Sequence, residues 1–132
     1  MLFDFSAAAL ALSAPSRSTS QALALAAADM REVDATIARR LESGVPLVGD
    51  VARYIISAGG KRLRPVLLLL TCGALGCTSA ERFNLAAVIE FIHTATLLHD
   101  DVVDESTKRR GRPTANLLWD NKSSVLVGDN LF

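Results

Sequence analysis

Residues 80–104 read AERFNLAAVIEFIHTATLLHDDVVD and contain neither glycine nor proline. Drawn as a helix, this stretch is apolar on nearly every side, which predicts a central and buried helix. It ends in three aspartates, at positions 100, 101 and 104. The sequence therefore predicts that carboxylates lie at one end of the helix around which the rest of the chain packs.

The flanking sequence predicts further helices separated by glycine and proline. Apolar residues recur at helical spacing over residues 21–41. Shorter helices are expected over about 47–57 and 64–75, a helical turn near 116–121, and another apolar element over 123–132. No internal repeat or strand-like alternation is present, so the expected fold class is all-α. Residues 1–20, rich in alanine and serine, are expected to form a flexible or loosely docked leader, and residues 21–132 are expected to form the N-terminal part of one helical domain.

The overall charge excludes two classes of partner. Fourteen lysines and arginines balance fourteen aspartates and glutamates, so no global field draws the protein to nucleic acid or to an acidic membrane. Cys72 and Cys77 lie in an apolar stretch without CxxC spacing, so both are expected to be buried and reduced. No signal peptide or membrane span is evident. We therefore expect a cytoplasmic protein with at most transient membrane contact.

The three aspartates are candidate metal ligands. Asp100 and Asp104 are four residues apart and share one helix face, with Asp101 beside them. Carboxylates crowded at an apolar helix end need a cation, and Mg²⁺ commonly bridges one or two carboxylates to substrate phosphates. For the aspartates alone, a solvated helix end is the competing interpretation.

Two basic clusters flank the acidic one and suggest anion binding. Residues 59–65 read GGKRLRP and place three cations at the expected start of a helix, where backbone N–H groups favour an anion. Residues 109–113 read RRGRP and follow the aspartates closely. A solvated loop for the first cluster, and charge balance for the second, remain the alternatives.

The two histidines are given different roles. His93 precedes Asp100 by seven residues, which places it two helical turns away on the same face, about 10 Å distant. A polar cavity along that stripe is therefore plausible. His99 adjoins Asp100 but points elsewhere, and we expect it to be structural.

Three blocks resemble one family. GGKRLRP at 59–65, EFIHTATLLHDDVVDES at 90–106 and RRGRPTAN at 109–116 look like the trans-isoprenyl diphosphate synthases, most of all their long-chain polyprenyl members. The resemblance covers about residues 30–132. It implies a bundle of antiparallel helices around a deep cavity, usually in a homodimer. The implied reaction joins isopentenyl diphosphate (IPP) to an allylic diphosphate such as farnesyl diphosphate.

The resemblance also implies residue roles. Lys61, Arg64, His93 and Arg110 would hold the diphosphate of IPP, and Arg109 would bind the allylic diphosphate. Asp100 and Asp104 would bind Mg²⁺, with Asp101 in the same catalytic motif.

The resemblance bears on product length as well. Bulky residues four or five places before the first aspartate block the growing chain in this family. Here those places hold the small residues Ala95 and Thr96, which implies a long all-trans product, a precursor of a quinone side chain. The competing interpretation is that Ala95 packs against a neighbouring helix and that the floor lies elsewhere.

Other functions remain open at this point. The family carries a second aspartate-rich motif downstream, so the 132 residues are expected to hold part of the site and to be inactive alone. Asn130 departs from the apolar residue expected there. The alternatives are a non-catalytic diphosphate-binding fragment or subunit, a short-chain farnesyl or geranylgeranyl synthase, and a terpene cyclase, which would consume no IPP.

Overall fold

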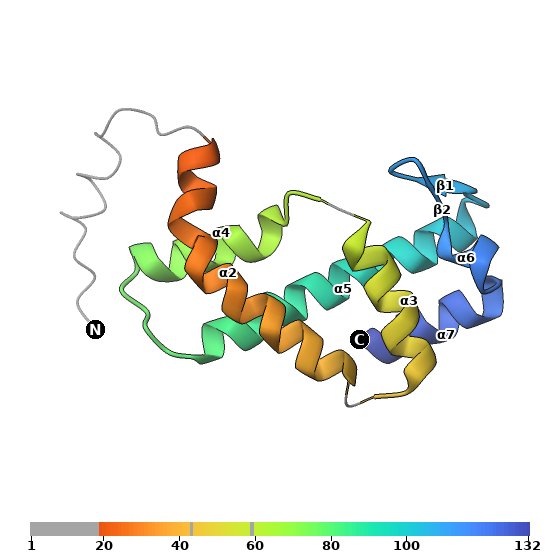
Figure 1. The fold of residues 1–132 in the computed structure, drawn as a ribbon, viewed down its shortest axis with the longest axis horizontal. Helices are drawn as coiled ribbons and strands as arrows, with labels where there is room; N and C mark the ends of the chain where they lie inside the picture. The colour runs from red at the N-terminus through yellow and green to blue at the C-terminus, as the bar shows by residue number, and fades with distance from the viewer. Residues whose placement is uncertain (1–18, 43, 59) are drawn as a thin grey trace.

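The computed structural model describes residues 19–42, 44–58 and 60–132, and it is helical as expected (Figure 1). The elements in chain order are α2 (Thr19–Glu42), α3 (Pro46–Ser57), α4 (Leu63–Ala74), α5 (Glu81–Val103), β1 (Lys108–Arg109), β2 (Arg112–Pro113), α6 (Ala115–Leu118) and α7 (Asn121–Leu131). The expected leader lies largely outside the described residues, except that its last two residues already belong to α2.

Local sequence explains where these helices begin and end. Pro46 opens α3, where a missing N–H costs nothing. Gly76, with a φ of 70°, follows the end of α4 in the left-handed conformation that favours glycine. The Asp120 side chain accepts a hydrogen bond from the Ser123 N–H at 2.6 Å and caps α7. The predicted helices are thus confirmed to within about two residues at most ends.

A small β-hairpin was not predicted. Strands β1 and β2 pair antiparallel, with Arg109 opposite Arg112, and each is only two residues long. Arg110 and Gly111 both have positive φ, 50° and 76°, which matches the two-residue turn that fits a hairpin. Alternation of apolar and polar residues cannot be detected over two residues. Gly111 and Pro113 therefore indicated only a break between helices, not a hairpin.

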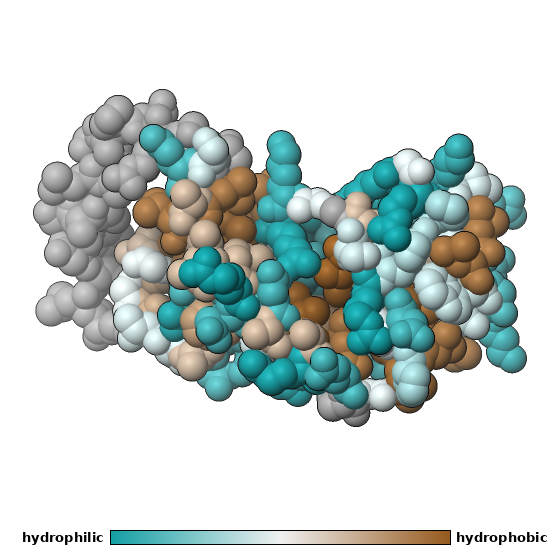
Figure 2. All heavy atoms as spheres, in the orientation of Figure 1, coloured by the Kyte–Doolittle hydropathy of each residue, from teal (hydrophilic) through white to brown (hydrophobic). Residues whose placement is uncertain are grey.

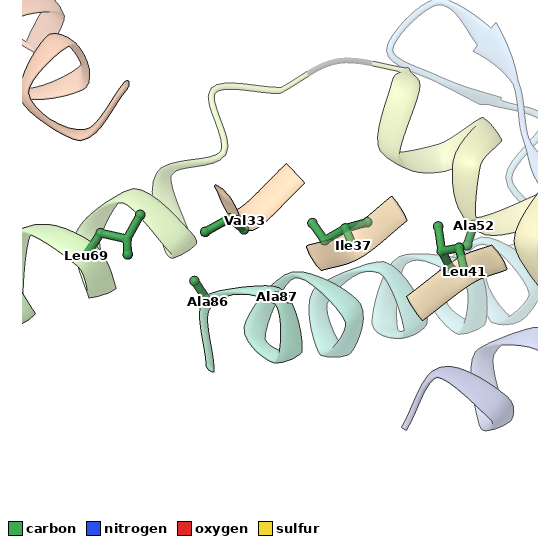
Figure 3. Packing of buried hydrophobic residues seen from close by; sticks show 7 residues of the cluster. All are labelled: Val33, Ile37, Leu41, Ala52, Leu69, Ala86 and Ala87. Carbon is green, nitrogen blue, oxygen red and sulfur yellow. The ribbon is translucent and has the colours of Figure 1, made fainter. Parts of the chain in front are cut away.

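Helix α5 is the central element, as its composition predicted. It contacts α2, α3, α4, α6 and α7, and Figure 1 shows it running through the middle of the molecule. In Figure 3, Val33, Ile37 and Leu41 of α2 lie in a row along α5, where they belong to the main buried hydrophobic cluster. This cluster comprises Val33, Ile37, Leu41, Ala52, Leu69, Ala86 and Ala87. The small alanines let α2 approach α5 closely, so the core is built by interlocking large and small side chains.

One face of the bundle is not covered by the described residues. Leu85, Val88 and Ile92 of α5 are 54%, 47% and 43% exposed, and Leu67 of α4 is 61% exposed. Figure 2 also shows apolar areas over α4 and near α6. Complete burial of α5 is therefore not observed among the described residues. None of the described helices has the length and hydropathy needed to cross a membrane.

Candidate functional site

The basic loop before α4 is held against α2 by an ion pair. Arg62 is the residue before the helix, has a φ of 46° and pairs with Asp34 of α2. This left-handed conformation is uncommon for a residue with a side chain. Lys61 and Arg64 flank Arg62 in the sequence. The ion pair therefore fixes both of them near the N-terminal end of α4.

A pocket of about 240 Å³ lies between this loop, α3, α5 and the hairpin. It contains all four residues that were expected to contact the diphosphate of IPP. The lining also includes residues that the sequence did not single out, among them the buried Glu90, which lies three residues before His93 on the same face of α5. The full lining is Ile55, Ile56, Gly60, Lys61, Arg62, Leu63, Arg64, Glu90, His93, Thr94, Leu97 and Arg110.

His93 is held as a neutral acceptor in this pocket. The Arg64 guanidinium lies 3.2 Å from His93 Nε2. A guanidinium can only donate, so Nε2 accepts and the ring proton sits on Nδ1. Partial burial, followed by the positive charge of Arg64, lowers the pKa of His93, and the Glu90 carboxylate opposes this shift. An anion entering the pocket would face four cationic side chains, and its charge would oppose the lowering of the His93 pKa.

The hairpin delivers Arg110 to the same pocket. Tyr54 of α3 donates a 2.7 Å hydrogen bond to the Pro113 carbonyl, and Arg112 stacks 4.3 Å above the Tyr54 ring. With the hairpin fixed in this way, the Arg110 guanidinium lies against Gly60, where an added Cβ would be 2.6 Å from Arg110 Nη1. The absence of a side chain at Gly60 therefore leaves room for the Arg110 guanidinium in this position, and its φ of 152° also favours glycine.

Asp101 and Arg109 form the most buried ion pair of the site. The Asp101 side chain is 3% exposed, and both of its oxygens accept hydrogen bonds from Arg109, at 2.7, 2.9 and 3.1 Å. These hydrogen bonds raise the pKa of Arg109. The charge-balance interpretation of the second basic cluster therefore applies to Arg109, whose Nε and Nη2 are engaged by Asp101.

The other two aspartates face solvent. Asp100 and Asp104 are exposed on the last turn of α5, and the Asp104 N–H donates to the Asp100 carbonyl at 2.8 Å. Among the described residues, no group of three or more metal-binding side chains comes together. Two free carboxylates nevertheless fit Mg²⁺, which usually keeps several waters and takes its remaining ligands from substrate phosphates. The three aspartates thus divide into one structural carboxylate and two available ones.

His99 belongs to the packing of α5 on α7, in agreement with its expected structural role. Its Nε2 lies 3.2 Å from the Val125 carbonyl and 3.4 Å from Asp129 Oδ1. Its ring also lies against Gly128, where a Cβ would collide with it. The imidazole is thus committed to α7 and turned away from the pocket.

The two residues proposed for the chain-length floor occupy different surroundings. Ala95 is completely buried among the described helices. Thr96 is exposed, and its hydroxyl donates to the His93 carbonyl at 2.7 Å. The packing interpretation left open for Ala95 thus agrees with its burial, whereas only Thr96 is accessible to a ligand.

The expected surroundings of the cysteines are wrong in part. Cys72 is half-buried and Cys77 is exposed, and neither is in a disulfide. The burial prediction failed because Cys77 follows Gly76 in a surface loop, beyond the apolar face of α4.

The chain matches the family model described as polyprenyl synthetase over residues 45–132. It is 52% identical over 108 residues to octaprenyl diphosphate synthase of Escherichia coli (strain K12), covering 82% of this chain and 33% of that protein. The crystal structure of a decaprenyl diphosphate synthase from Rhodobacter capsulatus superposes with a TM-score of 0.82 at 57% identity, covering 86% of this chain and 35% of that one. The crystal structure of a polyprenyl synthase from Caulobacter crescentus CB15, complexed with calcium and isoprenyl diphosphate, gives a TM-score of 0.83 at 47% identity. The match covers 89% of this chain and 37% of that one. The chain therefore spans about a third of the length of these relatives.

Proposed function

Because the chain belongs to the polyprenyl synthetase family, we propose that it supplies the IPP pocket and first metal-binding motif of a trans-prenyltransferase. The proposed reaction condenses IPP with an allylic diphosphate, farnesyl diphosphate or a similar primer, to give a long all-trans polyprenyl diphosphate. The observation that carries this proposal is the pocket that gathers Lys61, Arg64, His93 and Arg110 one or two helical turns from two exposed aspartates.

The pocket suits a diphosphate by its charge and donors. Four cationic side chains line it together with a neutral imidazole, and one of the four, Arg62, is paired with Asp34. Arginine forks match phosphate oxygens in bidentate geometry. Apolar Leu97 and Ile55 line its inner wall. We assign this pocket to IPP, with the diphosphate at the cationic rim.

The second diphosphate is assigned to the end of α5. Asp100 and Asp104 would hold Mg²⁺, which when bound supplies positive charge to the diphosphate leaving group of the allylic substrate. A solved relative that holds calcium and isoprenyl diphosphate supports a divalent cation with this substrate class. Arg109 would contact the allylic diphosphate through its Nη1, the nitrogen that Asp101 leaves unengaged.

The chain's residues contribute to the reaction by preorganised charge. Leaving-group charge grows as the allylic C–O bond breaks, and fixed donors stabilise it without rearranging. Asp101 positions Arg109, and Gly60 permits the position of Arg110. The apolar wall of the pocket would shield the allylic cation from water until the π electrons of the IPP double bond attack it. We assign the final proton loss to no side chain, since the released pyrophosphate can accept it.

The proposed product is long, and the proposed assembly is a homodimer. The length proposal rests on the small residue Thr96 on the accessible face and on similarity to octaprenyl and decaprenyl synthases. A quinone side-chain precursor is the proposed use. The homodimer follows from the family resemblance, and the exposed apolar residues of α4 and α5 fit a surface that further polypeptide covers.

A labelled-substrate assay tests these assignments. The complete protein that contains this chain is incubated with Mg²⁺, farnesyl diphosphate and labelled IPP, and the products are sized. We expect a long polyprenyl diphosphate, and Asp100→Ala should reduce turnover by orders of magnitude. A product only one isoprene unit longer than farnesyl diphosphate would replace the long-chain proposal with a short-chain one. No IPP consumption with farnesyl diphosphate or with a shorter allylic primer would refute the synthase.

Binding measurements test the IPP pocket separately from turnover. Lys61→Ala should weaken IPP binding more than farnesyl diphosphate binding, because Lys61 lines the IPP pocket and not the end of α5. Lys122→Ala, an exposed cation on α7 outside the pocket, is the matched control. Equal weakening of both substrates by Lys61→Ala would contradict the division into two pockets.

A further inference from the structure

The two cysteines of the chain meet across the C-terminus of α4. The Cys77 N–H donates to the Cys72 carbonyl at 2.9 Å, and the Gly76 N–H donates to the Gly73 carbonyl at 3.2 Å. This pair of hydrogen bonds around a left-handed glycine is the Schellman motif, in which the side chains three residues before and two residues after the cap touch each other. In this chain, both of those positions are cysteine.

The backbone geometry permits a disulfide between them. A direct 2.9 Å N···O contact between two residues keeps their Cα atoms within about 6.8 Å for standard bond lengths. Disulfides are formed at Cα separations of about 4.4–6.8 Å without moving the backbone. Neither thiol is in a disulfide, so both are available for exchange. The sequence has no other cysteine, so no third thiol within one chain competes.

We propose that Cys72 and Cys77 form a thiol–disulfide exchange site, at which a small-molecule disulfide such as oxidised glutathione is reduced to two thiols while an intramolecular disulfide forms across the end of α4. The site is independent of the proposed prenyl transfer. It lies at the opposite end of α4 from Arg64 and the diphosphate pocket.

The reaction proceeds in two exchanges with defined roles. The exposed Cys77 thiolate attacks one sulfur of the oxidant and expels the first thiol, leaving a mixed disulfide on Cys77. Cys72 then attacks the Cys77 sulfur, the mixed S–S bond breaks, and the second thiol leaves. The two protein thiols lose two protons and two electrons in total, and the oxidant disulfide gains both.

The order of attack follows from the surroundings of the thiols. Partial burial, followed by the charge and hydrogen bond of Cys77, raises the pKa of Cys72, whereas Arg82 lowers it. Arg82 is fixed nearby by hydrogen bonds to the Thr78 and Ser79 carbonyls. Once Cys77 is capped as a mixed disulfide, it carries no charge to oppose ionisation of Cys72, while Arg82 still favours it. Cys72 is therefore activated at the step in which it attacks.

The test uses the reduced protein in glutathione buffers of increasing oxidised fraction, followed by acid quenching, alkylation of free thiols and mass spectrometry. We expect both alkylation sites to disappear together, a chain lighter by two hydrogens, and a peptide linked between Cys72 and Cys77, independent of protein concentration. Cys72→Ser should accumulate the mixed disulfide on Cys77. Unreacted thiols, a persistent mixed disulfide on the unsubstituted protein, or disulfide-linked dimers would overturn the proposal.

A glycine pair tests whether the cap geometry brings the thiols together. Gly76→Ala adds a Cβ that meets nothing within 4 Å, so it acts only through the φ of 70°. It should lower the equilibrium constant for disulfide formation by about tenfold, the cost of a left-handed alanine in the turn. Gly73→Ala, inside α4 and equally open, should leave that constant unchanged. Equal constants for the two variants would refute the geometric basis of the pairing.

Discussion

Asp101 and Asp104 lie three residues apart in one motif. The structure predicts that the same substitution affects stability at the first position and metal-dependent activity at the second. Asp101→Asn removes the charge that holds Arg109, with little change in side-chain volume. Asp104→Asn removes an exposed charge at the end of α5, which makes it a matched control. We expect Asp101→Asn to lower the free energy of unfolding. We expect Asp104→Asn to abolish metal-dependent activity without changing that free energy.

The magnitude follows from burial and hydrogen bonding. Breaking a fully buried ion pair by removing one partner costs about 3–5 kcal/mol. The Asp101 side chain is 3% exposed, but that of Arg109 is 30% exposed, so water can partly solvate the released guanidinium. We therefore expect Asp101→Asn to lower the free energy of unfolding by about 2 kcal/mol. For a chain of this size that loss corresponds to a decrease in Tm of roughly 8 °C, whereas Asp104→Asn should stay within about 0.5 kcal/mol.

Thermal and urea unfolding followed by circular dichroism measure this difference directly. IPP binding to the two variants provides a second readout, because Asp101→Asn also frees the strand that precedes Arg110. We expect weaker IPP binding with Asp101→Asn and unchanged IPP binding with Asp104→Asn. Equal Tm values for the two variants, or a larger decrease for Asp104→Asn, would refute the assignment of Asp101 as the carboxylate that positions Arg109.

Three further predictions use other parts of the site. Gly60→Ala should displace the Arg110 guanidinium and raise the KM for IPP about tenfold or more, the loss of one charge-assisted hydrogen bond. Gly76→Ala, which also places an alanine at positive φ but in open space, should leave this KM unchanged. Equal KM values for the two variants would exclude the close approach. Thr96→Phe in the complete enzyme should shorten the product while Thr96→Ser should not, as sizing of labelled products would show; an unchanged length would place the floor elsewhere. His93 has a pKa below its usual 6.5, so its contribution to the free energy of unfolding is complete above pH 6.5 and decreases as the pH falls towards the folded pKa. His93→Gln should make the free energy of unfolding, measured with urea, less dependent on pH over that range. An identical pH profile for the variant would contradict the shift.

Much of the fold could be predicted from the sequence because its helices are marked by strong local signals. The absence of glycine and proline in α5, Pro46 at the start of α3 and Gly76 after α4 each act on the backbone within a few residues. Local preferences of this kind do not depend on distant partners. The hairpin could not be predicted, because two-residue strands have no periodicity and their pairing depends on contacts with Tyr54.

For the candidate site, the residue types and the helix faces they share can be read directly from the sequence. The i, i+4 spacing of Asp100 and Asp104 and the seven-residue step back to His93 follow from helix geometry alone. Three features depend on how the helices pack: Arg109 neutralises Asp101, Arg110 lies against Gly60, and Ala95 is buried while Thr96 is accessible. Helical spacing fixes the angle between neighbouring side chains, whereas burial and pairing depend on segments that come together only when the chain folds.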